Sequence, residues 1–118
     1  MVKLERISLR NEGLKKFFSP NEVRILGLLW EETRLTSGQI REHCSDLSLA
    51  CVAGTLDRLV KSGFVSRTID ESDSRVRYLY TATCNQQELG TKISEQVVDC
   101  LVETFGTAVV SSIGRFRR

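Results

Sequence analysis

The 118-residue sequence predicts an α+β domain in which three short helices precede a β-hairpin and a longer helix follows it. Three observations support this prediction. Helix-start signals occur at Ser19, Thr36 and Ser48, residues 75–81 alternate between apolar and polar, and an amphipathic run begins near residue 86. Hydrophobic residues make up 41% and charged residues 27%, the balance of an ordinary globular chain, which excludes a disordered tail or a collagen-like repeat.

The first helix follows an N-terminal extension, residues 1–18, in which Leu14, Phe17 and Phe18 fit one short helical turn. Residues 19–22 combine a capping serine, a first-turn proline and a glutamate three residues after the serine. Apolar residues then recur at helical spacing, which predicts a helix to about residue 32.

Two further helices are separated by a tight turn. Thr36 and Gln39 form a second capping box, which predicts a short helix ending near Cys44. After a polar turn, Ser48 caps a third helix that Gly63 ends. The inner face of this third helix is predicted to consist of Leu49, Val52, Leu56, Leu59 and Val60.

A hairpin is predicted from two extended segments, residues 64–69 and 75–81, with polar turn residues 70–74 between them. With a short strand predicted at Leu35, the order is helix, strand, helix, turn, helix and hairpin. This is the order of a winged helix-turn-helix, whose third helix enters the major groove of DNA and whose hairpin reaches the neighbouring backbone. Residues 19–83 are predicted to form this DNA-binding domain.

The C-terminal segment, residues 84–118, is predicted to be a helical dimerisation segment, with a capping box at Asn85 and Glu88. On a helical wheel, its apolar residues cover an arc of roughly 200°, which is wider than the face that packing against one small domain would bury. The apolar surface left over suggests contact with a second copy of the chain. Gly106 is predicted to kink or end this helix. The arc contains Leu89, Ile93, Val97, Val98, Cys100, Leu101, Val102, Phe105, Val109 and Ile113, of which Val98, Leu101, Val102, Phe105 and Val109 are the predicted dimerisation residues.

Composition argues against an enzyme. The sequence has one histidine and shows no glycine-rich phosphate loop, no nucleophile elbow and no His–Glu metal motif. No Cys-x-x-Cys pair occurs among the four cysteines, and no apolar run reaches membrane-spanning length. With an N-terminus that is charged from Lys3, the sequence predicts a cytoplasmic protein without a cofactor, a metal or a membrane partner.

The sequence resembles the penicillinase/methicillin-resistance repressor family over roughly residues 14–83. This resemblance implies a homodimeric transcriptional repressor that binds a palindromic double-stranded operator through a winged helix-turn-helix and dimerises through its C-terminal segment. The wing, with Asp70, Asp73 and Arg75, also resembles the multiple-antibiotic-resistance repressor type. The resemblance is carried by Leu28-Leu29-Trp30-Glu31, by Leu35-Thr36 with Gln39-Ile40, by Ser48 and Val52, by Leu56 and Arg58-Leu59-Val60-Lys61 with Gly63, and by Arg77-Tyr78 with Tyr80.

The predicted DNA-contacting residues lie on the third helix, the hairpin and two helix starts. The outward face of the third helix departs from the family, whose members usually carry polar or basic residues where this chain has Ala50, Cys51 and Gly54. Arg58 and Lys61 are its good donors to bases or phosphates. The full predicted set is Thr36, Ser37, Ser48, Ala50, Cys51, Gly54, Thr55, Arg58, Lys61, Arg75 and Arg77.

Two alternatives remain open from the sequence. Because the third helix carries little net charge, the small-residue face at Ala50, Ala53 and Gly54 is also compatible with docking a protein instead of DNA. A redox- or metal-responsive repressor would use Cys51, or His43 with Cys44, whereas buried packing is the ordinary role of such thiols. The sequence identifies no small-molecule effector.

Overall fold

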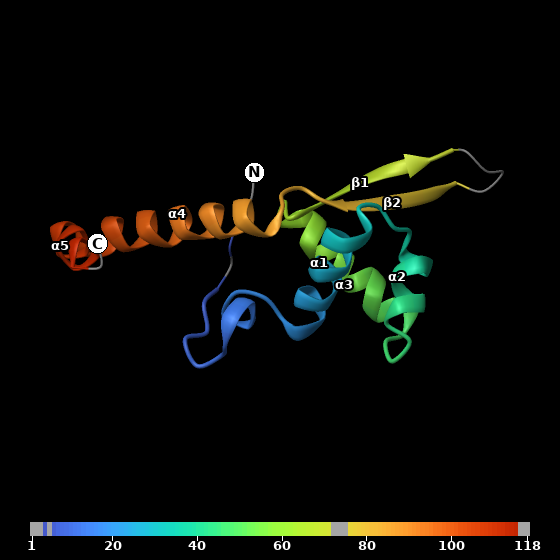
Figure 1. Ribbon diagram of the computed structural model, residues 1–118, viewed down its shortest axis with the longest axis horizontal. Helices are drawn as coiled ribbons and strands as arrows, with labels where there is room; N and C mark the ends of the chain where they lie inside the picture. The colour runs from blue at the N-terminus through green and yellow to red at the C-terminus, as the bar shows by residue number, and fades with distance from the viewer. Residues whose placement is uncertain (1–3, 5, 72–75, 116–118) are drawn as a thin grey trace. The chain divides into compact units, whose positions relative to one another are not determined.

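The computed structural model describes residues 4, 6–71 and 76–115, which form two compact units, Met1–Asn85 and Gln86–Arg118 (Figure 1). The first unit contains a 3₁₀ turn η1 and helices α1, α2 and α3, followed by strands β1 and β2. The second contains α4 and α5. The bounds are η1 Gly13–Lys16, α1 Pro20–Glu32, α2 Ser37–His43, α3 Leu49–Lys61, β1 Val65–Asp70, β2 Arg77–Ala82, α4 Gln86–Phe105 and α5 Thr107–Gly114.

The caps predicted at Ser19, Thr36 and Ser48 are confirmed. The Glu22 N–H donates to Ser19 Oγ at 3.2 Å, while the Ser19 N–H donates to Glu22 Oε1 at 2.9 Å. Thr36 and Gln39 make the same reciprocal pair at the start of α2. At α3, Ser48 Oγ accepts from the Cys51 N–H at 3.1 Å. Each cap satisfies backbone donors that the first helical turn leaves without a partner.

The core of the first unit lies where α1, α2 and α3 pack together, and Phe64 and Val65 extend it to the start of the hairpin. Leu49 differs from the prediction. It is 54% exposed because it is the first residue of α3 and lies one turn before Val52, where the buried face of the helix begins. Val60, also predicted to face inward, is half-buried. The fully buried side chains of this core include Ile25, Leu26, Leu29, Ile40, Val52, Leu56 and Leu59.

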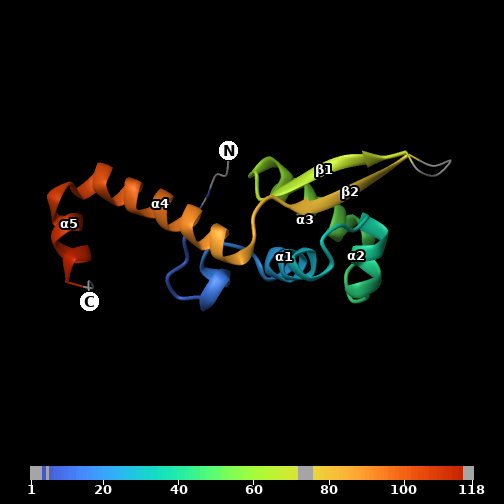
Figure 2. The ribbon, with the colours of Figure 1, turned by 45° about the horizontal axis from the view of Figure 1, so that its top comes forward.

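The predicted hairpin is confirmed. β1 and β2 pair antiparallel, from Val65 opposite Ala82 to Asp70 opposite Arg77. Leu35 adds a short bridge, since its N–H donates to the Tyr80 carbonyl at 3.1 Å and its carbonyl accepts from the Tyr80 N–H at 2.8 Å. Both views show the hairpin on one side of α1, α2 and α3 (Figures 1 and 2). This arrangement of three helices and a hairpin is the predicted winged helix-turn-helix.

In the second unit, the predicted break at Gly106 is confirmed. α4 ends at Phe105, and Gly106 adopts φ 63°, a left-handed conformation that glycine adopts readily, before α5 begins. The apolar arc therefore divides between two helices. Within the described part of the chain, no helix has both the length and the apolarity needed to cross a membrane.

Candidate nucleic-acid interface

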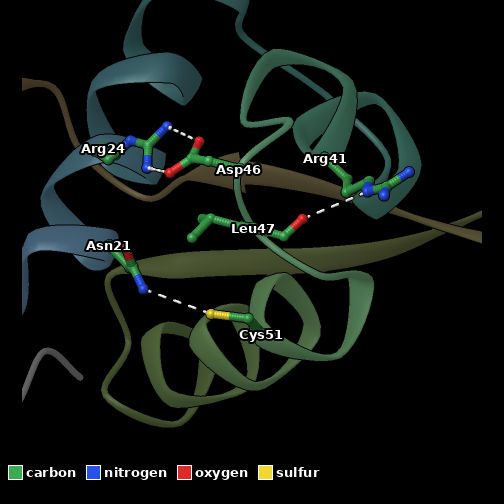
Figure 3. Close-up of polar contacts among 6 residues, drawn as sticks. All are labelled: Asn21, Arg24, Arg41, Asp46, Leu47 and Cys51. Atoms are coloured by element: carbon green, nitrogen blue, oxygen red, sulfur yellow. Dashed lines mark hydrogen bonds and ion pairs between the residues drawn. The ribbon is translucent and has the colours of Figure 1, made fainter.

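The turn between α2 and α3 sets the angle at which α3 is presented, and contacts from two helices hold it (Figure 3). The Arg24 guanidinium, on α1, makes two hydrogen bonds of 2.8 Å to the Asp46 carboxylate in the turn. Arg41 Nε, on α2, donates to the Leu47 carbonyl at 3.4 Å. The hydrogen bonds from Arg24 lower the pKa of the Asp46 carboxyl to about 2, so the carboxylate stays charged at acidic pH where an ordinary aspartate becomes protonated.

The exposed face of α3 carries two cations on a surface of small residues. Ala50, Ala53, Arg58 and Lys61 are exposed, and Gly54 is half-buried. A Cβ placed on Gly54 would have Arg58 Nη1 as its nearest neighbour, at 3.9 Å, which is an ordinary contact. Packing inside the chain therefore does not require glycine at this position.

Thr55 departs from the prediction. It is fully buried, at 0% exposure, so its hydroxyl is not available to a base or a phosphate. Instead, Thr55 Oγ1 donates to the Cys51 carbonyl at 2.9 Å and accepts from Arg58 Nη2 at 3.2 Å. Thr55 thus orients the Arg58 guanidinium and makes no direct contact of its own.

Cys51 also departs from the prediction, which put its side chain on the outward face. It is half-buried, and its Sγ accepts a hydrogen bond from Asn21 Nδ2 of α1 at 3.5 Å (Figure 3). The thiol therefore faces the contact between α1 and α3, because the first turn of α3 packs beside the start of α1.

The other cysteine-based alternative gains no support. Cys44 is buried, and the exposed His43 has its Nδ1 3.0 Å from the Gln39 carbonyl. Among the residues that the structure describes, no three His, Cys, Asp or Glu side chains are grouped as a metal site would require. Cys84 is buried, whereas Cys100, which belongs to the predicted apolar arc of residues 84–118, is exposed.

The hairpin brings its arginines close to carboxylates. Arg77 Nη2 lies 3.8 Å from Asp70 Oδ2 across the hairpin. Arg67 Nη1 lies 3.5 Å from Asp57 Oδ1 on α3, and the Arg67 guanidinium stacks over the Tyr78 ring at 4.6 Å from its centroid. Arg75, the other predicted wing contact, lies outside the described residues.

Sequence reasoning missed Arg67 as a candidate contact. It is exposed on β1 and joins the recognition helix to the wing through Asp57. The strand alternation provided a signal, because it places Arg67 on the same face as Tyr78. The pairing with Asp57 depends on how α3 packs against the hairpin, which no local pattern indicates.

The predicted helix-start residues remain near the surface. Ser48 is exposed, and Thr36 and Ser37 are half-buried, with the Ser48 and Thr36 side-chain oxygens already used in their caps. The Thr36 N–H donates to Gln39 Oε1, so Ser37 and Ser48 are the positions among these three that can offer a backbone N–H group to a phosphate.

The second unit has an exposed apolar face. Leu101, Val102 and Phe105 of α4 are exposed, Val98 is half-buried, and Leu101 and Phe105 line a cavity of about 300 Å³ with residues of α5. Val109 departs from the prediction of a dimerisation contact, since it is 8% exposed. The break at Gly106 starts a new helix, so Val109 does not continue the exposed stripe of α4.

Solved structures with a similar fold include regulators bound to DNA. AbfR of Staphylococcus epidermidis is 29% identical, with a TM-score of 0.56, over 87% of this chain and 74% of AbfR. Reduced AbfR bound to DNA is 31% identical with the same coverage and TM-score. A mutant MarR from E. coli, at 21% identity and a TM-score of 0.53, shows the fold alone; the match covers 80% of this chain and 65% of MarR.

A search of curated proteins finds no match. The family model described as penicillinase repressor matches residues 18–115, which include the helices of the first unit, the hairpin and the helices of the second unit. The chain therefore belongs to the penicillinase repressor family and is a DNA-binding transcriptional regulator with a winged-helix fold.

Proposed function

We propose that the protein is a homodimeric repressor that binds a palindromic double-stranded operator. The observation that carries the proposal is the exposed face of α3, where Arg58 and Lys61 stand on a helix whose presentation angle is held by the Arg24–Asp46 pair. A repressor of this kind acts on chromosomal DNA, so we also propose a cytoplasmic location. The proposed action involves neither catalysis nor a cofactor.

The proposed contacts with DNA differ in their chemistry. Arg58 and Lys61 supply donors to bases or phosphates, and Arg75 and Arg77 of the wing contact the neighbouring backbone. Ala50 and Gly54 offer no side-chain donor, so they suit close approach of the helix and apolar contact with thymine methyl groups. The first helical turns at Ser37 and Ser48 add backbone N–H groups for phosphates.

Dimerisation is proposed through the second unit. Val98, Leu101, Val102 and Phe105 leave an apolar face of α4 that a second copy would cover. A symmetric pair of α3 helices would then match two half-sites about one helical turn apart, which is why the operator is proposed to be palindromic.

The first test is a titration of the full chain against mixed genomic DNA fragments at two salt concentrations, with the retained fragments sequenced. Selective retention of a few palindromic fragments supports the proposal. Weak retention that disappears in moderate salt indicates non-specific contact and contradicts it.

Matched variants then test the assigned surface on a selected fragment. Replacing both Arg75 and Arg77 by Ala should reduce the slope of log affinity against log salt by about two phosphate contacts. The double variant Arg10→Gln with Lys15→Gln removes the same charge from exposed positions of the N-terminal extension and serves as the control. An unchanged slope in the wing variant, or an equal change in the control, would overturn the wing assignment.

Docking of a protein on α3 is the second candidate. It is favoured by the weak charge of this surface, where Asp57 pairs with Arg67 and the exposed Leu49, Ala50 and Ala53 are apolar. In that case the genomic titration retains no fragment selectively, and Ala53→Gln, which adds bulk and no charge, weakens capture of a protein partner without changing DNA retention.

A further inference from the structure

The N-terminal half of α3 exposes aliphatic side chains. Leu49, at its first position, is 54% exposed, and Ala50 and Ala53 are exposed as well. Leu49 and Ala53 are four positions apart, so they lie on the same face of the helix. The chain is a DNA-binding regulator, and a recognition helix meets base edges chiefly through its N-terminal residues. The residues expected at the bases are therefore aliphatic.

The polar side chains in this half of α3 are engaged inside the chain. From Leu49 to Leu56, all of which the structure describes, the polar residues are Cys51 and Thr55. Cys51 Sγ accepts from Asn21 Nδ2 of α1 at 3.5 Å (Figure 3). Thr55 is fully buried, and its Oγ1 donates to the Cys51 carbonyl at 2.9 Å. The first two turns of α3 therefore have no exposed hydroxyl, amide or charged group to offer to a base.

An aliphatic surface in the major groove can recognise one feature of a base, the methyl group at C5 of a pyrimidine. Thymine is the ordinary DNA base that carries this group, and apolar side chains contact it favourably. The neighbouring C4 position carries a carbonyl in thymine and an amino group in cytosine, which hydrogen-bonding side chains distinguish and aliphatic ones do not. A methyl group at C5 of cytosine occupies the same place in the groove, so an aliphatic contact meets it as it meets thymine.

We propose that Leu49, with Ala50 and Ala53, recognises the 5-methyl groups of pyrimidines in the operator, and that 5-methylcytosine is accepted in place of thymine. The inference rests on the proposed function, since it concerns how the DNA-facing side of α3 selects an operator. It has a regulatory consequence. A site with cytosine in place of a contacted thymine binds weakly, and methylation of that cytosine at C5 restores its affinity. Arg58 and Lys61, in the last turn of α3, supply the hydrogen bonds to other bases or to phosphates.

The first test uses the full chain and an operator fragment selected from genomic DNA. Each thymine of one half-site is replaced in turn by uracil, which removes the methyl group and keeps the base pair. At least one replacement should weaken binding about fourfold, the effect of withdrawing one methyl-sized group from an apolar contact. Unchanged affinity after every replacement would overturn the inference.

A second test separates the methyl group from the base pair. At a position sensitive to uracil, the thymine–adenine pair is replaced by cytosine–guanine and then by 5-methylcytosine–guanine. Affinity should fall about fourfold with cytosine and return with 5-methylcytosine, because the aliphatic contact meets the same methyl group. Affinity that stays low after methylation would show that the base pair itself is recognised, contrary to the proposal.

A variant assigns the contact to Leu49. In Leu49→Ala, the preference for thymine over uracil at the sensitive position should fall from about fourfold to nearly none. The ratio of the two affinities is the readout, because a change in folding alone would weaken both operators equally. Leu9→Ala is the matched control, since it removes an aliphatic side chain that is 83% exposed in the N-terminal extension and should keep the preference of the wild type. A preserved preference in Leu49→Ala would overturn the assignment.

Failure of this inference and failure of the proposed function give different results. A selected operator that binds equally well with thymine and with uracil overturns the methyl recognition alone. Absence of any selectively retained fragment overturns the proposed function and the methyl recognition with it, and assigns the aliphatic face of α3 to a protein partner instead.

Discussion

A substitution at Gly54 distinguishes the role of this residue in folding from its role in DNA binding. It lies in the middle of α3, where glycine is less favourable than alanine by about 1 kcal/mol. The position that a Cβ would occupy is 3.9 Å from its nearest neighbour, Arg58 Nη1. Gly54→Ala should therefore stabilise the folded protein, because nothing in the chain has to move to accept the methyl group.

The size of the effect follows from helix propensity alone. We expect a gain of about 1 kcal/mol in the free energy of unfolding, which raises the midpoint of thermal unfolding by about 4–8 °C for a unit of this size. DNA affinity should move the other way. If the α3 backbone approaches the DNA closely at Gly54, the methyl group displaces the helix, and a loss of about tenfold corresponds to one base contact.

The assay pairs urea unfolding with a DNA titration at one fixed protein concentration, since the stability of the proposed dimer would depend on concentration. Gly27→Ala is the matched control. Gly27 lies in α1, and a Cβ there would meet nothing within 4 Å, so this variant should gain similar stability and keep its DNA affinity.

Two results would refute the reasoning in different places. Loss of stability in Gly54→Ala, with a gain in Gly27→Ala, would show that residue 54 is more crowded than its surroundings indicate. Greater stability with unchanged DNA affinity in both variants would show that α3 does not approach DNA closely at this position.

Three further predictions concern charge and assembly. Asp57→Asn removes the carboxylate that lies 3.5 Å from Arg67, so the slope of log DNA affinity against log salt should steepen by about one contact, and an unchanged slope would count against a DNA-facing Arg67. Arg24 lowers the pKa of the Asp46 carboxyl from 3.8 to about 2. The ionised carboxylate therefore stabilises the fold above its unfolded pKa, and this contribution to stability is lost as pH falls from about 4 to about 2. The difference in urea midpoint between wild type and Asp46→Asn should shrink over this range, and a constant difference would be contrary to the assignment. Phe105→Asp places a charge on a side chain that is 63% exposed on the apolar face of α4, so sedimentation should detect monomers, and a persistent dimer would exclude this face as the interface.

The sequence by itself determined the features that depend on neighbours a few residues apart. Ser19 with Glu22 and Thr36 with Gln39 are pairs three residues apart, and their hydrogen bonds form as predicted since the first turn of a helix brings those positions together. Gly106 ends α4 for a similarly local reason, its left-handed backbone conformation. The strand alternation likewise located the hairpin to within a residue or two of its bounds.

Tertiary structure alone decided which side chains of α3 face outward and which groups meet across elements. Thr55 and Cys51 lie near the boundary of the helical wheel, so the packing of α1 against α3 determined that one is buried and the other faces Asn21. Arg24 meets Asp46 across 22 positions of sequence, and one cavity unites residues from the extension, α1 and α3. Such contacts depend on how whole helices pack, and the sequence pattern fixes the apolar face of each helix but not the exact rotation at which that face is buried.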